Sequence, residues 1–211
     1  MSEHPPDEGA GVDVPGAEGA GVRWFAEWTP AQRAEYAERF TRLAASGTDI
    51  DGEARLVDAL APRDAAILDA GCGTGRVAAA LDARGHRVVG VDIDPMLIEA
   101  GRRQHPGLPL ACLDLRQVTP GIGHFQLVVC AGNVMVFLEP GTEPDVLRAL
   151  ASVMVADGRA VFGFATDRDY TPEHLDRDAA AVGWRLEHRW ATWHADAWHD
   201  GADWAVSVYR T

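Results

Sequence analysis

The chain has 211 residues, of which 47% are hydrophobic, and it carries a net charge of −13 at pH 7. This length suits one globular domain with a sizeable core, and no apolar run approaches the roughly 20 residues that a membrane-spanning helix needs. All 19 basic residues are arginines, and the 32 acids outnumber them. Such a surface repels phosphate backbones, so we expect neither nucleic acid nor a membrane as a partner.

The first 21 residues are rich in glycine, proline and acids and contain no lysine or arginine. Because they hold too few apolar side chains to form a core, residues 1–21 are predicted to be a disordered acidic tail. They also lack the basic start and apolar stretch of a secretory signal, so we expect a cytoplasmic protein. Three cysteines lie in or beside apolar runs without C-x-x-C spacing, which favours buried thiols over a metal or redox site.

Residues 22–62 are predicted to form helices. Thr29 and Pro30 are typical of a helix start, with threonine as the cap and proline at the first helical position. A second helix is expected from Gly52 to Leu60, with Pro62 just beyond its end.

A glycine-rich turn follows the first predicted strand. The strand ends at Asp69, and Gly71, Gly73 and Gly75 come next, before a predicted helix from Val77 to Arg84. In dinucleotide-binding proteins the third glycine comes one residue later, and pyrophosphate rests on the helix N-terminus. An acid placed before the first glycine would repel pyrophosphate but would suit an amine. The turn therefore indicates a site for a cationic nucleoside without phosphates, and it argues against an NAD-type oxidoreductase.

The segment from Asp69 to Gly75 resembles the first motif of class I S-adenosylmethionine-dependent methyltransferases. Three further segments resemble the later motifs of this family in the same order, and they are residues 87–92, 110–115 and 125–138. The resemblance covers residues 54–165 well. It implies S-adenosyl-L-methionine as the cofactor.

The resemblance assigns roles to the first two motifs. Asp69 would meet the methionine ammonium group, and Asp92 would accept hydrogen bonds from both ribose hydroxyls. The backbone of the glycine turn, including Cys72, would approach the methionine and ribose portions. Each of the two acids has an alternative role as the cap of a neighbouring helix.

The later motifs would bind the adenine and flank the methyl group. Asp114 would accept from the adenine amine, while Ile93 and Leu115 would pack against the ring. Asn133 would orient either the methionine carboxylate or the acceptor. Asp114 and Asn133 are also ordinary turn residues, so a purely structural role stays open for both. The sequence identifies no general base.

The fold that the resemblance implies is a single α/β domain. It has a Rossmann-like sheet of seven strands, mostly parallel with an antiparallel last strand, and helices on both faces. Residues 63–211 would form this methyltransferase domain, and residues 22–62 would form a lid over cofactor and substrate. Three aromatic residues are candidates for the inner surface of that lid, namely Trp24, Trp28 and Tyr36.

The C-terminal third adds local predictions. A capping box at Thr142 and Asp145 opens a helix that ends at Asp157-Gly158, and a strand follows over Arg159–Phe164. Another helix is expected over residues 172–182. Trp184, Leu186, His188 and Trp190 alternate with charged residues and are predicted to be the buried side of a strand. Histidines and aspartates crowd the last hairpin, where a solvated tip is favoured over a metal site.

We therefore predict an enzyme that moves a methyl group to an O, N or C nucleophile of a small-molecule acceptor. The alternative is an S-adenosylmethionine-binding protein without turnover, such as a regulatory or partner subunit. The expected assembly is a monomer or a homodimer.

Overall fold

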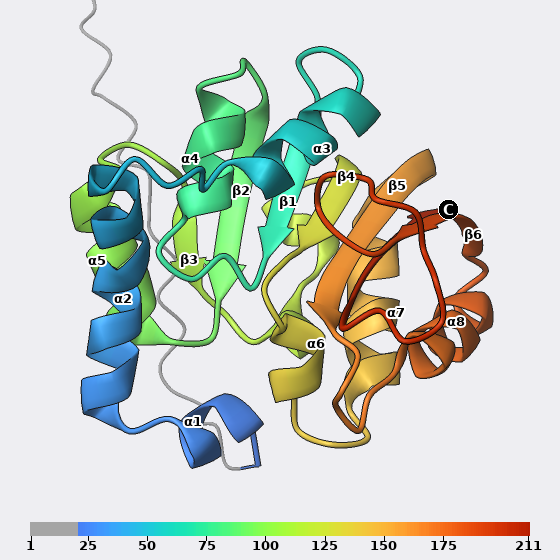
Figure 1. Cartoon of the computed structure of the whole chain (residues 1–211). Coiled ribbons are helices and arrows are strands. Elements are labelled where there is room, and N and C mark those ends of the chain that lie inside the picture. Colours follow the sequence, from blue (N-terminus) through green and yellow to red (C-terminus); the bar gives the residue numbers. More distant parts are fainter. Residues whose placement is uncertain (1–20) are drawn as a thin grey trace, which may run out of the picture.

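The structure is a computed structural model, and it describes residues 21–211. The predicted disordered tail, apart from Gly21, lies outside the described residues. A single seven-stranded sheet organises the chain, in the order β3-β2-β1-β4-β5-β7-β6 (Figure 1). The strands are β1 (Ala66–Ala70), β2 (Arg87–Asp92), β3 (Leu110–Cys112), β4 (Phe125–Cys130), β5 (Met154–Ala165), β6 (Arg185–Trp190) and β7 (Trp204–Arg210).

The strand directions confirm the predicted topology. Neighbours from β3 to β5 are parallel, and β7 runs antiparallel to both β5 and β6. The chain passes from β1 outward to β2 and β3, and then returns to place β4 on the other side of β1. Strand order therefore reverses at β1, and in open α/β sheets ligands bind at the carboxyl ends of the strands at such a point.

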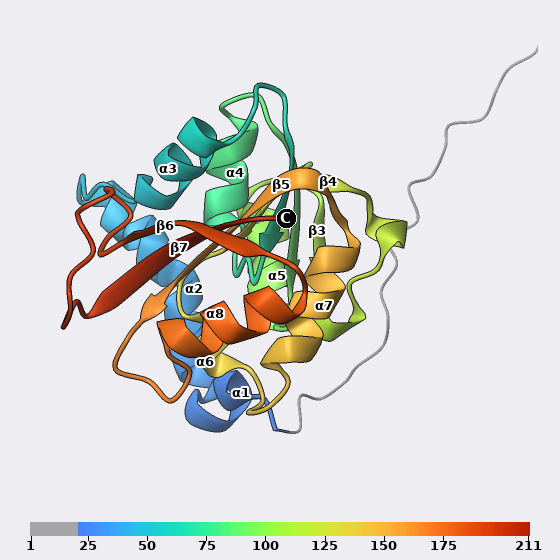
Figure 2. The same ribbon diagram turned by 90° about the vertical axis from the view of Figure 1, so that its right-hand side faces the viewer.

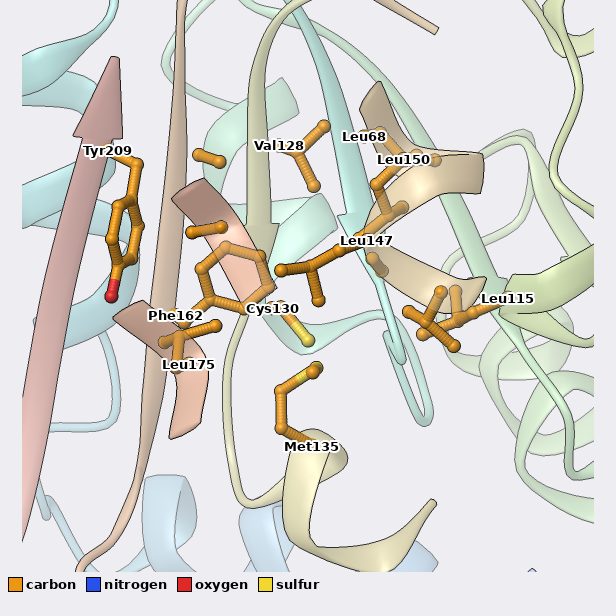
Figure 3. Packing of buried hydrophobic residues seen from close by; sticks show 14 of the residues in the cluster. Leu68, Leu115, Val128, Cys130, Met135, Leu147, Leu150, Phe162, Leu175 and Tyr209 are labelled. Carbon is orange, nitrogen blue, oxygen red and sulfur yellow. The ribbon is translucent and has the colours of Figure 1, made fainter. Parts of the chain in front are cut away.

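Helices cover both faces of the sheet, also as predicted. On one face α3 (Gly52–Leu60) and α4 (Arg76–Asp82) bury apolar side chains against β1, β4, β5 and β7. On the other face α7 (Glu143–Ser152) and α8 (Pro172–Ala181) lie side by side, in front of the strands in Figure 2. Figure 3 shows how Leu147, Leu150 and Leu175 of these helices meet Val128 and Phe162 of the strands.

The remaining helices lie around the carboxyl ends of the strands or beside the β3 edge. Helix α2 (Pro30–Ala45) packs along α5 (Pro95–Gln104), and α1 (Arg23–Glu27) lies near α6 (Val134–Phe137) (Figure 1). Two single-turn 3₁₀ helices, η1 (Leu115–Gln117) and η2 (Pro120–Ile122), connect β3 to β4. None of the described helices is both long and apolar enough to cross a bilayer.

The N-terminal helix predictions are confirmed. Thr29 caps α2 with the predicted proline at the first position, and Gln32 completes a capping box through its side chain. Helix α3 begins at Gly52 and ends at Leu60 as expected.

The predicted capping box at Thr142 does not form. The Thr142 hydroxyl donates to the carbonyl of Glu139 at 2.7 Å instead of accepting from the first turn of α7. The helix also ends earlier than predicted, at Ser152, because Met154 already pairs with Phe125 of β4 and opens strand β5. Sheet pairing therefore displaces the last turn of the predicted helix.

The predicted alternation in β6 is wrong in its middle part. Leu186 is 39% exposed, and the half-buried side chains are the charged Glu187 and Arg189. The register to β7 shifts between Leu186 and His188. Glu187 forms ion pairs with two arginines, and Arg189 pairs with Asp176 of α8, so the side of the strand that the alternation predicted to face solvent is half-buried and its charges are compensated.

Candidate functional site

A cavity of about 540 Å³ opens at the carboxyl ends of the strands around β1. It brings together the predicted site residues from four separate segments of the chain, with the exception of Gly75. Those that line it are Asp69, Gly71, Cys72, Gly73, Asp92, Ile93, Asp114, Leu115 and Asn133. The motifs that lie far apart in sequence thus share one site.

The glycine turn after β1 serves both packing and access. Gly71 has φ +78°, and a Cβ there would lie 2.3 Å from Val134 of α6, so no other residue fits. Gly73 has φ +57°, and a Cβ there would meet no atom closer than 3.9 Å, so it would project into the cavity. Gly75 precedes α4 and lies against Leu110 rather than the cavity.

Asp69 is a buried carboxylate on the cavity wall, 1% exposed. Its Oδ2 accepts from the backbone N–H of Ala78 at 3.0 Å, in the first turn of α4. The alternative role as a helix cap is therefore real. The other oxygen accepts no hydrogen bond from the described residues and stays available to a ligand. Burial raises the pKa of Asp69 to about 7.

Asp92 ties the glycine turn to the end of β2. Its Oδ2 accepts from Gly73 N–H and its Oδ1 from Asp94 N–H, both at 2.8 Å. Burial raises the pKa of this carboxyl to about 6. Each carboxylate oxygen has a second lone pair, so both oxygens can still accept from a pair of neighbouring hydroxyls. The cap of α5 is Asp94, which accepts from Met96 N–H.

Asp114 lies at the end of β3 and is paired inside the protein. It accepts from the backbone N–H of Arg116 and forms an ion pair with that guanidinium at 2.6 Å. Arg116 also contacts Glu139 at 3.0 Å. The turn role is therefore present here too, while Ile93 and Leu115 line the cavity beside it.

Asn133 stands at the turn after β4 with φ +71°, a left-handed conformation that few residues other than glycine adopt. Its N–H donates to Gly163 O at 3.3 Å, and its side-chain Oδ1 accepts from Ala165 N–H at 2.8 Å. Both partners belong to β5. The turn is thus fixed against the neighbouring strand, at the wall of the cavity.

The predicted aromatic residues line the cavity. Trp24 stacks on Trp28 at 4.8 Å between ring centroids, and Tyr36 and Phe137 meet Trp24 edge to face. Burial raises the pKa of the Tyr36 phenol. This cluster joins α1, α2 and α6 across the carboxyl ends of the strands (Figure 1).

A buried carboxylate fastens the aromatic cluster to the sheet. Asp94 is fully buried, and its Oδ2 accepts from Trp24 Nε1 and from Arg33 Nη1, each at 2.8 Å. Because Asp94 N–H also donates to Asp92, the N-terminal helices are connected to the cavity wall through one chain of hydrogen bonds.

Sequence reasoning missed several residues that line the cavity. Glu53 of α3 forms a two-pronged ion pair with Arg76 of α4, at 2.6 and 3.0 Å. Arg168 follows β5, and Trp193 comes from the loop between β6 and β7. Glu53 and Arg76 are visible in the sequence as opposite charges, but nothing in the pattern indicated that they form an ion pair. Nothing in the sequence indicated that Trp193 would line the cavity, apart from the abundance of tryptophan in the chain.

Among residues 21–211, no three histidine, cysteine or acidic side chains gather closely enough to hold a metal ion. The polar groups on the inner wall of the cavity are instead buried carboxylates and backbone groups. The negative charge of Asp92 adds to burial in raising the pKa of Asp69, so the wall carries a negative field. Such a field favours a cationic ligand.

Comparison with known proteins shows the family of the chain. A family model described as a methyltransferase domain matches residues 67–158. The chain is similar to a putative methyltransferase of Bacillus subtilis, YqeM, with 32% identity over 100 residues. That match covers 46% of this chain and 40% of the relative, so less than half of the relative's length is represented.

Solved structures give a longer match. A TehB-like S-adenosylmethionine-dependent methyltransferase from Corynebacterium glutamicum superposes with a TM-score of 0.81 and 40% identity, covering 86% of this chain and 98% of its own. The S-adenosylmethionine-bound amino pentose methyltransferase CalS10 from Micromonospora echinaspora shares the fold, with a TM-score of 0.63 at 20% identity, covering 87% and 98% of the two chains. The chain belongs to the S-adenosylmethionine-dependent methyltransferases, and S-adenosyl-L-methionine is its cofactor.

Proposed function

We propose that this protein transfers a methyl group from S-adenosylmethionine to an O, N or C nucleophile of a small molecule. The observation that carries the proposal is the cavity itself, whose volume of about 540 Å³ is in the range of small-molecule sites. Its wall of buried carboxylates suits a cofactor with an ammonium and a sulfonium charge. The acidic surface speaks against a nucleic acid as the acceptor.

The acids of the cavity would hold the cofactor by its polar groups. The free oxygen of Asp69 would accept a charge-assisted hydrogen bond from the methionine ammonium. Asp92 would accept from the two ribose hydroxyls with the lone pairs that Gly73 and Asp94 leave open. Asp114 would accept from the adenine amine, although its ion pair with Arg116 leaves it fewer free lone pairs.

Backbone and apolar groups would complete the cofactor site. Gly71, Cys72 and Gly73 form the wall on which the methionine and ribose portions would lie, and Gly75 would support this turn from behind. The adenine ring would pack between Ile93 and Leu115. We also propose that residues 22–62 act as the lid, with the tryptophan pair facing the site.

The chemistry needs little from the protein beyond orientation. When bound, S-adenosylmethionine supplies a methyl group that is already activated on a sulfonium. The lone pair of the acceptor forms the new bond to the methyl carbon, and the electron pair of the broken carbon–sulfur bond stays on sulfur. Holding the two reactants in line at near-contact distance can provide most of the acceleration. The reaction would take place in the cytoplasm, in a monomer or a homodimer.

The test is to incubate the protein with S-adenosylmethionine and pools of small carboxylates, phenols, amines and enolisable ketones, and to measure S-adenosylhomocysteine. Formation above the acceptor-free background with at least one pool supports the proposal. Turnover only with protein or nucleic acid would contradict it. Tight cofactor binding without turnover on any acceptor would favour the alternative of a binding subunit.

A further inference from the structure

We propose that the acceptor is a planar organic anion, such as an aromatic carboxylate or phenolate, and that Asn133 and Arg168 hold its negative oxygen. This inference rests on the proposed function. It follows from which hydrogen-bonding groups of the cavity are already occupied and which remain free.

Asn133 presents a donor to the cavity. Its Oδ1 is taken by the N–H of Ala165, so the amide nitrogen is the end that remains for a ligand. The left-handed backbone at this residue is held by bonds to two residues of β5 and by the first turn of α6, whose Val136 and Phe137 N–H groups donate to Asn133 O. Left-handed residues other than glycine often occur at functional sites, where the backbone directs a side chain toward a ligand.

Arg168 adds a positive charge on the same side. Its guanidinium lies over the ring of Phe137, 5.8 Å from the centroid, and Phe137 is at the end of the short helix that Asn133 opens. Among the described residues, the only carboxylate that forms an ion pair with it is that of Asp167, at 3.8 Å, which is 81% exposed. Arg168 is therefore weakly paired. Of the other three arginines that line the cavity, Arg76 and Arg116 are each occupied by acids at 3.0 Å or less. The third, Arg39, belongs to α2 and lies over the ring of Phe40, away from the turn that holds Asn133.

The carboxylates that line the cavity already have partners within the protein. Every carboxylate among the described residues of the cavity already accepts a hydrogen bond from a backbone N–H or an arginine, and no histidine lines it. Tyr36 keeps its proton because burial raises its pKa. The oxygens that Asp69 and Asp92 leave open are those that the proposed function gives to the cofactor, so no carboxylate is left to remove a proton from the acceptor. An anionic acceptor needs no base because its lone pair is already free.

Trp193 supplies a flat wall next to Asn133. Its indole lies so close to Gly163 that a Cβ there would be 2.2 Å from Trp193 Cζ2, and the carbonyl of the same Gly163 accepts from Asn133 N–H. A ring of the acceptor can stack on such a surface, which is why we choose a planar anion over an aliphatic one.

The test uses three ligands of one shape, namely benzoate, benzamide and benzylamine, titrated into protein saturated with S-adenosylhomocysteine. Binding is followed by calorimetry and by tryptophan fluorescence. We expect benzoate to bind in the millimolar range and at least tenfold more tightly than benzamide, and benzylamine to bind most weakly. No benzoate binding, or equal binding of the three, overturns the inference.

Two variants make the test specific. Arg168→Gln and Asn133→Asp should each reduce the preference for benzoate by roughly tenfold. The aspartate keeps the oxygen that accepts from Ala165 and replaces only the donor. Arg148→Gln, on the exposed side of α7, is the matched control and should change nothing. If Asn133→Asp weakens S-adenosylhomocysteine binding tenfold and leaves benzoate preference intact, Asn133 serves the cofactor and the inference is wrong. Failure of the cofactor itself to bind would instead refute the proposed function.

Discussion

Cofactor affinity should fall steeply when the pH is lowered from 8 to 6. The cause is Asp69, whose pKa burial raises to about 7. Only the ionised carboxylate can attract the methionine ammonium, so protons compete with the cofactor for this side chain. Because the pKa is raised, the affinity is high above it and is lost as the pH falls through it.

The size of the effect follows from the ionised fractions. With a pKa of about 7, Asp69 is ionised in about 90% of molecules at pH 8 and in about 10% at pH 6, which lowers the affinity about tenfold. Asp92, with a pKa of about 6, adds about a factor of two over the same range. The total is about twentyfold, or about 1.8 kcal/mol.

Calorimetric titration in two buffers of different ionisation enthalpy measures this directly. Near pH 7, binding should release about half a proton from Asp69, with a smaller share from Asp92. Asp69→Asn keeps the bond to Ala78 N–H and should abolish the tenfold component. Asp82→Asn, an exposed acid of α4, is the control. An affinity that is constant between pH 6 and 8, or a tenfold change that survives in Asp69→Asn, would refute the reasoning.

Three further predictions test the architecture. Asp92→Ala should weaken S-adenosylmethionine binding more than tenfold, roughly 1.5–3 kcal/mol, and an unchanged calorimetric affinity in a folded variant would remove this acid from the site. Asp94→Ala leaves the buried guanidinium of Arg33 without its carboxylate and should lower the free energy of unfolding in urea by about 3–5 kcal/mol. A loss below about 1 kcal/mol would show that this ion pair contributes little to stability. Gly163→Ala should cost about 1–3 kcal/mol by collision with Trp193, and adding Trp193→Ala should recover most of it. Failure of that second change to recover stability would mean that the strain lies elsewhere.

The sheet and the placement of the motif acids and glycines around one cavity could be predicted from the sequence. Strands of a parallel sheet are continuous apolar runs, and the acids and glycines that follow them stand at one edge because all the carboxyl ends meet there. The positions of Asp69, Asp92 and Asn133 around one cavity follow from this geometry alone. Their roles as ligand-binding residues remain predictions.

Contacts between distant segments could not be predicted from the sequence. Nothing in the local pattern indicated that Trp24 and Arg33 share the carboxylate of Asp94, or that Trp193 lies on Gly163. In β6 the apolar alternation failed because burial was decided by ion pairs with other strands and with α8, which a period-two pattern does not contain. Local propensity likewise assigned Met154 to a helix that the pairing of β5 with β4 shortens.

The two outer strands of the sheet have a consequence for the behaviour of the protein in solution. A sheet edge with a long, flat, apolar strand invites another chain to add to it, which leads to aggregation. Here one edge is β3, which has only three residues, and the other is β6, where Arg185, Glu187 and Arg189 alternate with other side chains. The register shift in β6 further disturbs its outer row of hydrogen-bonding groups. Both edges thus resist edge-to-edge growth, and the protein should stay dispersed at concentrations where an unprotected sheet would form fibres.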